Sequence, residues 1–404
     1  MIAHSGKYRK KNGQRGYVMM NNFIFENKTK VYFGKGGVKE YLGGLLANFG
    51  ETVMLAYGGG SIKCNGVYDE IMGILNAQGK CVVEFSGIMS NPTYAKVQEG
   101  AKLARENHVD LILAVGGGSV SDCCKVTSAQ AKLDEDIWEM QYTKHTLPTK
   151  FIPLGTIVTV FGTGSEMNNG AVITHEEKKI KGALWGAQAE FAFLDPAYSL
   201  SVPMQQVISG AFDTLSHAME TYFGKPDENN LSDDINEAVM RSVIRNIRVL
   251  LKSPESYEAR SELAWASAMA ENGVLKIGKI TDFQCHQIEH QLGAYTNCNH
   301  GKGLAVIHPV LYRHLCTAGA ARFARFAQNV FGLAPKDSIE ETALAGLEAL
   351  AAFIKEIGLP TTLTELGIPA DTDLRAVADS TNITAGCCKK LTHDEIYEIL
   401  LECK

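Results

Sequence analysis

The segment L-I-L-A-V-G-G-G-S-V-S-D occupies residues 111–122 and decides the class of fold. Its first half, Leu111–Val115, is an uninterrupted apolar run of the length of a buried strand. Its second half opens with a glycine-rich turn made of Gly116, Gly117, Gly118 and Ser119. A strand followed by such a turn and then a helix is typical of a parallel sheet whose two faces are covered by helices.

The same G-G-G-S word occurs upstream, after the apolar run Val53–Tyr57, as Gly58, Gly59, Gly60 and Ser61. Two further apolar runs, Cys81–Phe85 and Phe151–Leu154, predict buried strands, and the amphipathic segment Tyr94–Asn107 predicts a helix between them. The first half of the chain is therefore predicted to be an α/β domain with a parallel sheet.

Beyond Pro203 the strand signals nearly vanish, and helical periodicity predicts long helices that include Leu231–Leu251, Tyr257–Leu275 and Ile339–Ile357. We expect a boundary near Ser201 between an α/β domain of residues 20–201 and an all-α domain of residues 202–404. The first 19 residues are polar and basic, and we expect them to form a disordered extension.

Composition excludes several classes of protein. The 404 residues carry a net charge of -6, with 45% hydrophobic and 21% charged residues, and no strongly basic domain is present to neutralise nucleic-acid phosphates. No apolar run has the length of a membrane span, and no secretory signal is visible. The ten cysteines include no C-x-x-C pair, so neither a disulfide framework nor a zinc finger is indicated. We expect a cytoplasmic enzyme with no nucleic-acid or membrane partner.

The two glycine turns are candidate phosphate-binding loops. Glycine lets the backbone approach a phosphate closely, and the helix that follows offers unpaired N–H groups. A third segment, T-I-V-T-V-F-G-T-G-S-E at residues 156–166, adds the hydroxyl groups of Thr156, Thr159 and Thr163. Neither turn matches G-x-G-x-x-G, so the usual dinucleotide fingerprint is absent. One such turn alone could be a plain strand-to-helix connection; two copies of the same word favour a nucleotide site.

Candidate metal ligands lie in the second half of the chain. Asp213 and His217 are four residues apart on a helix predicted over Met204–Tyr222, so both side chains lie on one face. His286 and His290 have the same spacing, and His300 follows after a turn. An isolated histidine is usually a surface or core residue, but three imidazoles and one carboxylate would bind a divalent ion and leave coordination positions open.

The sequence motifs of this chain together resemble those of the iron-containing, group III alcohol dehydrogenases. The resemblance rests on G-G-G-S-V-S-D (116–122), G-T-G-S-E (162–166), D-P (195–196), G-A-F-D-T-L-S-H-A-M-E (210–220) and H-Q-I-E-H with N-H-G-K-G (286–303). It extends from about Met20 to the C-terminus and is greatest for the NADPH-dependent butanol dehydrogenase and aldehyde reductase branch.

The resemblance implies roles for individual residues. It implies that one divalent metal, Fe(II) or Zn(II), is held by Asp213, His217, His286 and His300. It implies a proton relay through His290. It also implies cofactor contacts from both glycine loops, the threonines before G-S-E and a lysine after a hairpin; these contacts are Gly59, Gly60, Ser61, Asn91, Gly116, Gly117, Gly118, Ser119, Asp122, Thr156, Thr159, Thr163 and Lys181.

The resemblance also implies an activity, namely hydride transfer between a nicotinamide cofactor and a small aliphatic aldehyde or alcohol such as butanal or butanol, by a homodimer. Relatives that prefer NAD carry an acidic residue in the first glycine loop, whereas this chain has Gly60 and Ser61 there and Lys63 two residues on. An acidic side chain would repel a 2'-phosphate, so we expect NADP(H) to be preferred over NAD(H).

Two other enzyme classes remain open at this point. A lyase like dehydroquinate synthase also uses NAD and a metal, but it needs basic residues around a substrate phosphate, and few lie near residues 286–302. A metal-dependent hydrolase would explain the ligands but leave both glycine turns without a role. The chain departs from the common family pattern at Val160 and Phe161, where we expect Phe161 to narrow the space around the cofactor or substrate.

Overall fold

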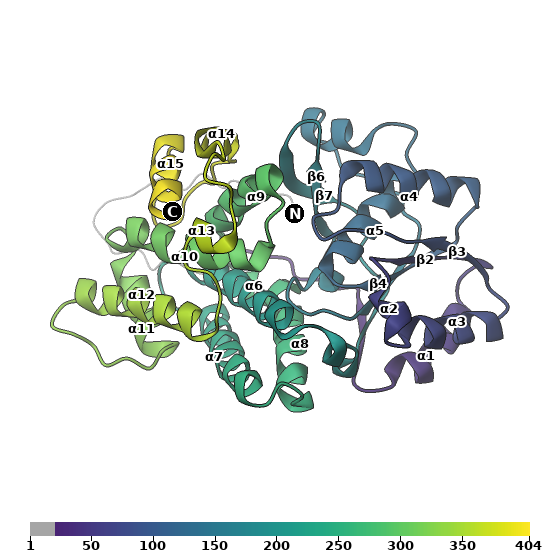
Figure 1. The fold of residues 1–404 in the computed structure, drawn as a ribbon, viewed down its shortest axis with the longest axis horizontal. Helices are drawn as coiled ribbons and strands as arrows, with labels where there is room; N and C mark the ends of the chain where they lie inside the picture. The colour runs from purple at the N-terminus through teal and green to yellow at the C-terminus, as the bar shows by residue number, and fades with distance from the viewer. Residues whose placement is uncertain (1–20) are drawn as a thin grey trace.

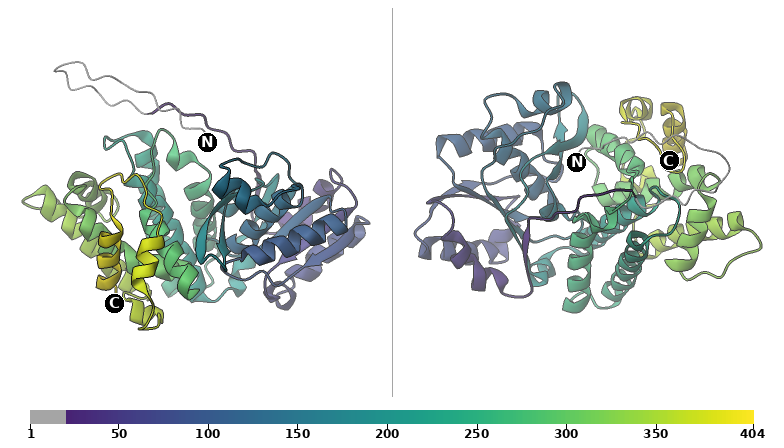
Figure 2. Two further views of the ribbon diagram at one scale, coloured as in Figure 1. Left: turned by 90° about the horizontal axis from the view of Figure 1, so that it is seen from above. Right: turned by 180° about the vertical axis from the view of Figure 1, so that it is seen from behind.

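A computed structural model of the chain describes residues 21–404, so the predicted extension of residues 1–19 lies outside the described residues. The chain folds into a sheet-containing half and a helical half that lie side by side (Figure 1). Two further views show the same division from above and from behind (Figure 2). This arrangement confirms the predicted fold class.

Six parallel strands form the sheet, in the order β1-β8-β5-β4-β2-β3. These strands are β1 (Lys30–Phe33), β2 (Thr52–Tyr57), β3 (Cys81–Phe85), β4 (Leu111–Gly116), β5 (Leu154–Val158) and β8 (Phe191–Leu194). The helices of this half are α1 (Gly37–Leu46), α2 (Ser61–Cys64), α3 (Val67–Ala77), α4 (Tyr94–Glu106) and α5 (Gly118–Gln130).

Alternation along β4 explains why helices cover both faces of the sheet. Leu111, Leu113 and Val115 pack in a core that includes α1 and α3 residues, whereas Ile112 and Ala114 pack in a core with α4 and α5 residues. Successive side chains of a strand point to opposite faces, so an entirely apolar strand requires cover on both.

The carboxyl ends of three adjacent strands meet at one edge of the sheet. Tyr57 of β2 pairs with Val115 of β4, and Gly116 pairs with Val158 of β5. The two G-G-G-S turns and the segment after β5 therefore lie next to one another, at the edge where open parallel sheets bind their ligands.

Several strands differ from the sequence prediction. The strand predicted at 151–154 lies instead at Leu154–Val158, after Pro153. Gly155 and Thr156 make this segment less apolar, so the sequence pattern did not mark it as a strand. The strands β1 and β8 were not predicted. An antiparallel hairpin of β6 (Gly170–His175) and β7 (Ile180–Trp185) was not predicted as a pair of strands either.

The C-terminal half is helical and has one extended apolar core. Its helices are α6 (Met204–Tyr222), α7 (Leu231–Lys252), α8 (Tyr257–Glu271), α9 (Gln284–Thr296), α10 (His300–Cys316), α11 (Ala320–Asn329), α12 (Ile339–Glu356), α13 (Leu363–Leu366), α14 (Leu374–Ser380) and α15 (His393–Glu402). Among residues 21–404, no helix combines the length and apolarity that a bilayer crossing requires.

The segment after β5 fixes the two halves against each other. A Cβ atom on Gly210 of α6 would lie 2.3 Å from the carbonyl oxygen of Phe161, so only glycine permits this approach. The Thr214 hydroxyl donates to the carbonyl of Gly162 at 2.9 Å. The Ser267 hydroxyl of α8 accepts the N–H groups of Gly162 and Gly164 at 2.9 and 3.0 Å. These contacts place α6, with Asp213 and His217, against the segment after β5.

Candidate active site

Three helices bring the predicted metal ligands together. Asp213 and His217 are one turn apart on α6, and His286 lies on α9. His300 is the first residue of α10, whose N-cap Asn299 accepts the N–H of Lys302. The start of α10 thus fixes where the His300 ring enters the site.

The distances fit a single divalent ion. The Oδ1 atom of Asp213 lies 3.5 Å from Nε2 of His286, 3.4 Å from Nε2 of His300 and 3.7 Å from Nδ1 of His217. A tetrahedral ion with bonds of about 2.0–2.2 Å separates its ligand atoms by roughly 3.3–3.6 Å. Among residues 21–404, two groups of donor atoms lie within 4.8 Å of one another, Asp213 with His286 and His300, and Glu289 with His290 and His300; His217 belongs to neither group and so lies somewhat apart.

Buried polar atoms without partners point to the same conclusion. Asp213 Oδ1, His286 Nε2 and His217 Nδ1 are buried, and within residues 21–404 none has a hydrogen-bond partner. Buried polar groups are normally paired, since leaving one unpaired costs about 1–3 kcal/mol. A cation among these three atoms would satisfy all of them.

Two carboxylates that were not predicted from the sequence contact the rings of the predicted histidine ligands. Glu220 accepts the ring Nδ1 of His286 and also the backbone N–H of Cys285. Glu289 accepts the ring Nδ1 of His300. A proton held on Nδ1 leaves Nε2 free to bind a metal, so both carboxylates set the tautomer that a ligand histidine needs. Spacing offered a signal, because Glu220 lies seven residues after Asp213 and so shares its helix face.

These charges shift the acid–base behaviour of the ligands. Burial alone would lower the pKa of His286, but Glu220 and Asp213 outweigh burial and raise it to about 10. Burial would raise the pKa of Asp213, but His217 and His300 hold it well below its usual range. Burial lowers the pKa of His217 to about 4.

His290 lies one turn after His286 and faces the same cluster, with ring centres 5.9 Å from His286 and 5.5 Å from His300. Burial, with Lys181 and His300, lowers its pKa well below the usual value. The imidazole is neutral, and its buried Nδ1 has no hydrogen-bond partner in the described part of the chain.

The second glycine loop is shaped by tight contacts as well as by the helix that follows it. A Cβ atom on Gly118 would lie 2.2 Å from Oγ1 of Thr163, and one on Gly117 would lie 3.2 Å from Cβ of Val160. The helix α5 begins at Gly118, which makes Ser119 part of its first turn. The loop therefore combines a helix N-terminus, which favours anions, with a close fit against the segment after β5.

The first glycine loop is more open. Cβ atoms on Gly59 and Gly60 would meet no atom within 4 Å, and Gly60 has φ of 106°, which favours glycine. The short helix α2 begins at Ser61.

The charge around this loop differs from the sequence expectation. Lys63 donates to the Glu84 carboxylate of β3 at 3.1 Å, and Tyr57 and Tyr68 also donate to it. The hydrogen bonds from Tyr57 and Tyr68 lower the pKa of Glu84 to about 2. Lys63 is therefore already paired, and a carboxylate does lie beside the loop, supplied by the neighbouring strand.

The predicted cofactor residues around β5 and α5 differ in where they lie. Thr159 and Thr163 follow β5 at the edge of the sheet. Asp122 accepts the hydroxyl of Ser165 and the N–H of Val172, so its carboxylate fastens α5 to the segments around it. Thr156 lies inside β5, is fully buried and bonds the carbonyl of Phe191. Thr156 thus lies before the carboxyl edge of the sheet, and its contact with a cofactor stays a prediction.

Lys181 and Asn91 of the sheet half both contact the helical half. Lys181 lies within β7 and not after the hairpin, and its Nζ lies 3.3 Å from Oε2 of Glu289. The side chain of Asn91 donates to Oδ1 of Asn297 at 2.8 Å and to the carbonyl of Cys298 at 3.3 Å. Two predicted cofactor contacts therefore touch the segment 289–298, which lies between the predicted metal ligands His286 and His300.

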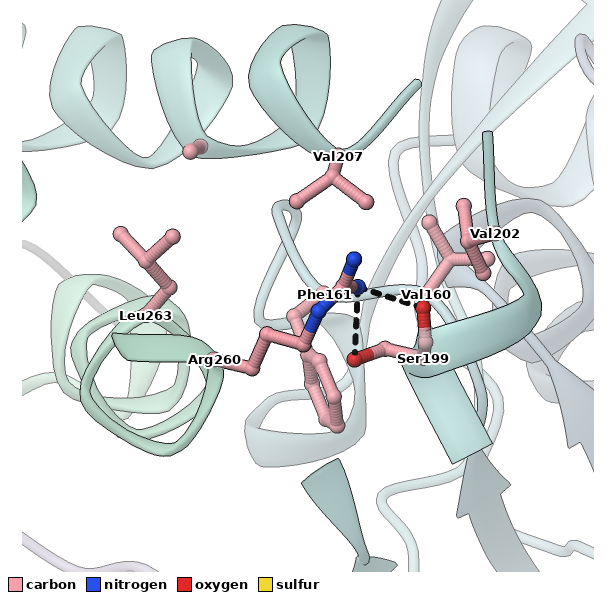
Figure 3. Close-up of a pocket in the computed structure, with 8 residues that line it drawn as sticks. Val160, Phe161, Ser199, Val202, Val207, Arg260 and Leu263 are labelled. Atoms are coloured by element: carbon pink, nitrogen blue, oxygen red, sulfur yellow. Dashed lines mark hydrogen bonds between the residues drawn. The ribbon is translucent and has the colours of Figure 1, made fainter. Parts of the chain in front are cut away.

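Phe161 lines a small apolar cavity between α6, α8 and the segment before α6 (Figure 3). Arg260, on the same cavity, donates to the hydroxyl of Ser199 at 3.3 Å. The cavity is lined by Val160, Phe161, Ser199, Val202, Val207, Ala211, Arg260 and Leu263.

Comparison with known proteins assigns the family. The model described as iron-containing alcohol dehydrogenase matches residues 28–196, and the C-terminal model of the same family matches residues 207–403. The chain is 38% identical to the probable NADH-dependent butanol dehydrogenase 1 of Bacillus subtilis, over 94% of this chain and 99% of that protein. It is 34% identical to the NADPH-dependent aldehyde reductase YqhD of Escherichia coli, over 86% of this chain and 90% of that protein.

A solved structure agrees with these matches. The crystal structure of NADH-dependent butanol dehydrogenase A from Thermotoga maritima superposes with a TM-score of 0.90 at 34% identity, covering 95% of this chain and 99% of that one. The matches confirm the resemblance predicted from the motifs and favour a dehydrogenase over the lyase and the hydrolase. The chain belongs to the iron-containing alcohol dehydrogenase family and is an enzyme of the alcohol dehydrogenase class.

Proposed function

We propose that this enzyme transfers hydride between NADP(H) and a small aliphatic aldehyde or alcohol such as butanal or butanol, with one divalent metal, Fe(II) or Zn(II). Residues 20–201 would form the cofactor domain and residues 202–404 the metal domain. The observation that carries the proposal is the convergence of four ligand-type side chains beside Lys181 and Asn91, which come from the sheet half. The names of relatives, butanol dehydrogenase and aldehyde reductase, support the substrate class.

Asp213, His217, His286 and His300 would hold the metal. One carboxylate and three neutral imidazoles would leave a divalent ion with a net charge near +1. A bound metal of this kind supplies Lewis-acid stabilisation of charge that develops on a carbonyl oxygen. Glu220 and Glu289 each hold the Nδ1 side of their histidine, so that Nε2 of His286 and of His300 is the atom that would face the metal.

Other residues of the chain would position the reactants. The two glycine loops and the start of α5 would bind the phosphates, and Asn91 and Lys181 would hold the nicotinamide end beside α9. A neutral His290, buried next to His286 and His300, would accept or donate a hydrogen bond in passing a proton between solvent and the alkoxide oxygen.

The preference for NADP(H) is supported by the open space at Gly59 and Gly60 and by the lack of an acidic side chain within residues 58–61. Glu84 lies beside this loop, but Lys63, Tyr57 and Tyr68 already satisfy its carboxylate. Relatives differ in this respect, since one is named for NADH and another for NADPH.

The direct test is the absorbance of NADPH at the nicotinamide band when butanal is added to protein loaded with Fe(II) or Zn(II). We expect the absorbance to fall with the loaded protein and to stay constant with protein stripped by a chelator. Parallel assays with NADH give the cofactor ratio. No consumption of either cofactor with any short aldehyde would refute the proposed activity.

We also propose a homodimer that works in a reducing compartment such as the cytoplasm. Three apolar side chains lie just before the edge strand β1 and are largely exposed: Phe23 at 53%, Ile24 at 95% and Phe25 at 45%. Together they offer an apolar surface on which a second copy could pack. All ten cysteines are free, as reducing conditions require. Light scattering on the purified chain tests the dimer, and a monomeric mass at micromolar concentration would contradict it.

A further inference from the structure

The carboxylate of Glu289 has two cationic or N–H partners from opposite halves of the molecule. Its Oε2 atom accepts the ring Nδ1 of His300 and lies 3.3 Å from Nζ of Lys181. Glu289 is fully buried and Lys181 is 5% exposed, so water does not screen the pair. The other carboxylate oxygen, Oε1, accepts the Cys298 thiol at 3.8 Å.

The surroundings are shaped to hold this contact. A Cβ atom on Gly293 would lie 3.1 Å from Nζ of Lys181, and one on Gly303 would lie 2.9 Å from Cγ of Glu289. The side chain of Gln291 donates to the backbone carbonyl of Lys181 at 3.2 Å. Two glycines thus leave room for the pair, and α9 holds the strand that carries Lys181.

Donor atoms of Glu289, His290 and His300 also lie within 4.8 Å of one another, but the Oε2 atom of Glu289 is already engaged by His300 and Lys181. It contacts Nδ1 of His300, whereas Nε2 of the same ring faces Asp213 at 3.4 Å. The carboxylate therefore lies behind the ring and acts on the metal only through His300.

We propose that Glu289 is a positioning residue that links cofactor binding to metal binding, by sharing its carboxylate between Lys181 of the sheet half and the ligand His300. This inference rests on the proposed function. Without cofactor, the Lys181 ammonium offsets part of the negative charge of Glu289, so Glu289 polarises the His300 ring less and His300 is a weaker metal ligand. When the cofactor engages Lys181, the charge of Glu289 acts mainly on His300, so the metal binds more tightly. By thermodynamic reciprocity the metal must tighten cofactor binding by the same factor.

Glu220 provides a matched control. It accepts Nδ1 of His286 as Glu289 accepts Nδ1 of His300, but its other partner is the N–H of Cys285 in the same helical half. Both carboxylates therefore support a ligand, and only Glu289 also contacts the cofactor half.

The test measures the Zn²⁺ dissociation constant by competition with a chelating dye, with and without saturating NADPH, for wild type, Glu289→Gln and Glu220→Gln. We expect each variant to bind Zn²⁺ about 10–100-fold more weakly than wild type. We expect NADPH to tighten Zn²⁺ binding about fivefold or more in wild type and in Glu220→Gln, and less than twofold in Glu289→Gln. The reciprocal effect of Zn²⁺ on NADPH affinity, followed by nicotinamide fluorescence, should match.

Full linkage in Glu289→Gln, an equal loss of the linkage in Glu289→Gln and Glu220→Gln, or no linkage in wild type would overturn the inference. If Glu289→Gln does not fold, Lys181→Met decides, since it too should abolish the linkage while Zn²⁺ still binds. The proposed function fails separately, when wild-type protein binds no dinucleotide or leaves NADPH unconsumed with butanal.

Discussion

The hydroxyl of Ser267 is the contact on which the placement of the two halves depends most clearly. It is fully buried on α8 and accepts two backbone N–H groups, from Gly162 at 2.9 Å and from Gly164 at 3.0 Å. In Ser267→Ala both donors lose their acceptor in a place that water does not reach. Each such buried donor costs about 1–3 kcal/mol, so the two cost roughly 2–6 kcal/mol. Alanine returns about 0.5 kcal/mol through its helix propensity, which leaves a net loss of about 1.5–5.5 kcal/mol.

Urea unfolding of wild type and Ser267→Ala measures this loss as a shift of the transition midpoint. Ser261→Ala is the control, because Ser261 is on the same helix but bonds only the carbonyl of Tyr257 within that helix. We expect the control to change stability by less than about 0.5 kcal/mol. Because the freed segment also carries Thr163, which packs on Gly118, Ser267→Ala should weaken NADPH binding as well. A stability change as small as that of the control would refute the reasoning.

Three further predictions follow from the site. His286→Ala should lose Zn²⁺ binding and butanal reduction together but keep NADPH binding, because the glycine loops lie in the other half; full activity would remove His286 from the ligand set. Gly59→Asp should move the cofactor preference toward NADH by about tenfold or more, since a carboxylate near a 2'-phosphate costs roughly 1–4 kcal/mol, whereas Gly59→Asn should not. Position 59 suits this test better than Gly60, whose positive φ would add strain. Burial lowers the pKa of His286, but Glu220 outweighs burial and raises this pKa to about 10. Below that pH, Zn²⁺ must therefore displace a proton from His286 in order to bind. Zn²⁺ affinity should therefore rise by about tenfold per pH unit between about pH 7 and 9, and a flat profile would contradict this assignment.

Local patterns were sufficient for much of the fold. The helix α6 begins and ends as predicted, at Met204 and Tyr222, because its apolar positions repeat at helical spacing after Pro203. The strand β4 and its glycine turn were recognisable because an apolar run and a turn signal are adjacent in the chain. The spacing of Asp213 and His217 likewise followed from helix geometry alone.

Features that depend on distant contacts were not predictable in this way. The hairpin β6–β7 is mixed in polarity, and it is defined by its pairing and by its packing on α5 and α9. Glu289 and Lys181 are 108 residues apart, and only the fold reveals their ion pair. The same is true of Lys63 and Glu84, whose contact crosses from the loop after β2 to the neighbouring strand and changes the charge that a cofactor would meet.

Anomalous diffraction from crystals of the chain loaded with Zn²⁺ and NADP tests the metal site most directly. We expect one strong peak within about 2.0–2.2 Å of Asp213 Oδ1 and of ring nitrogens of His217, His286 and His300, with the nicotinamide ring beside it. A metal peak elsewhere, or these four side chains hydrogen-bonded to one another with no metal between them, would contradict the proposed metal site.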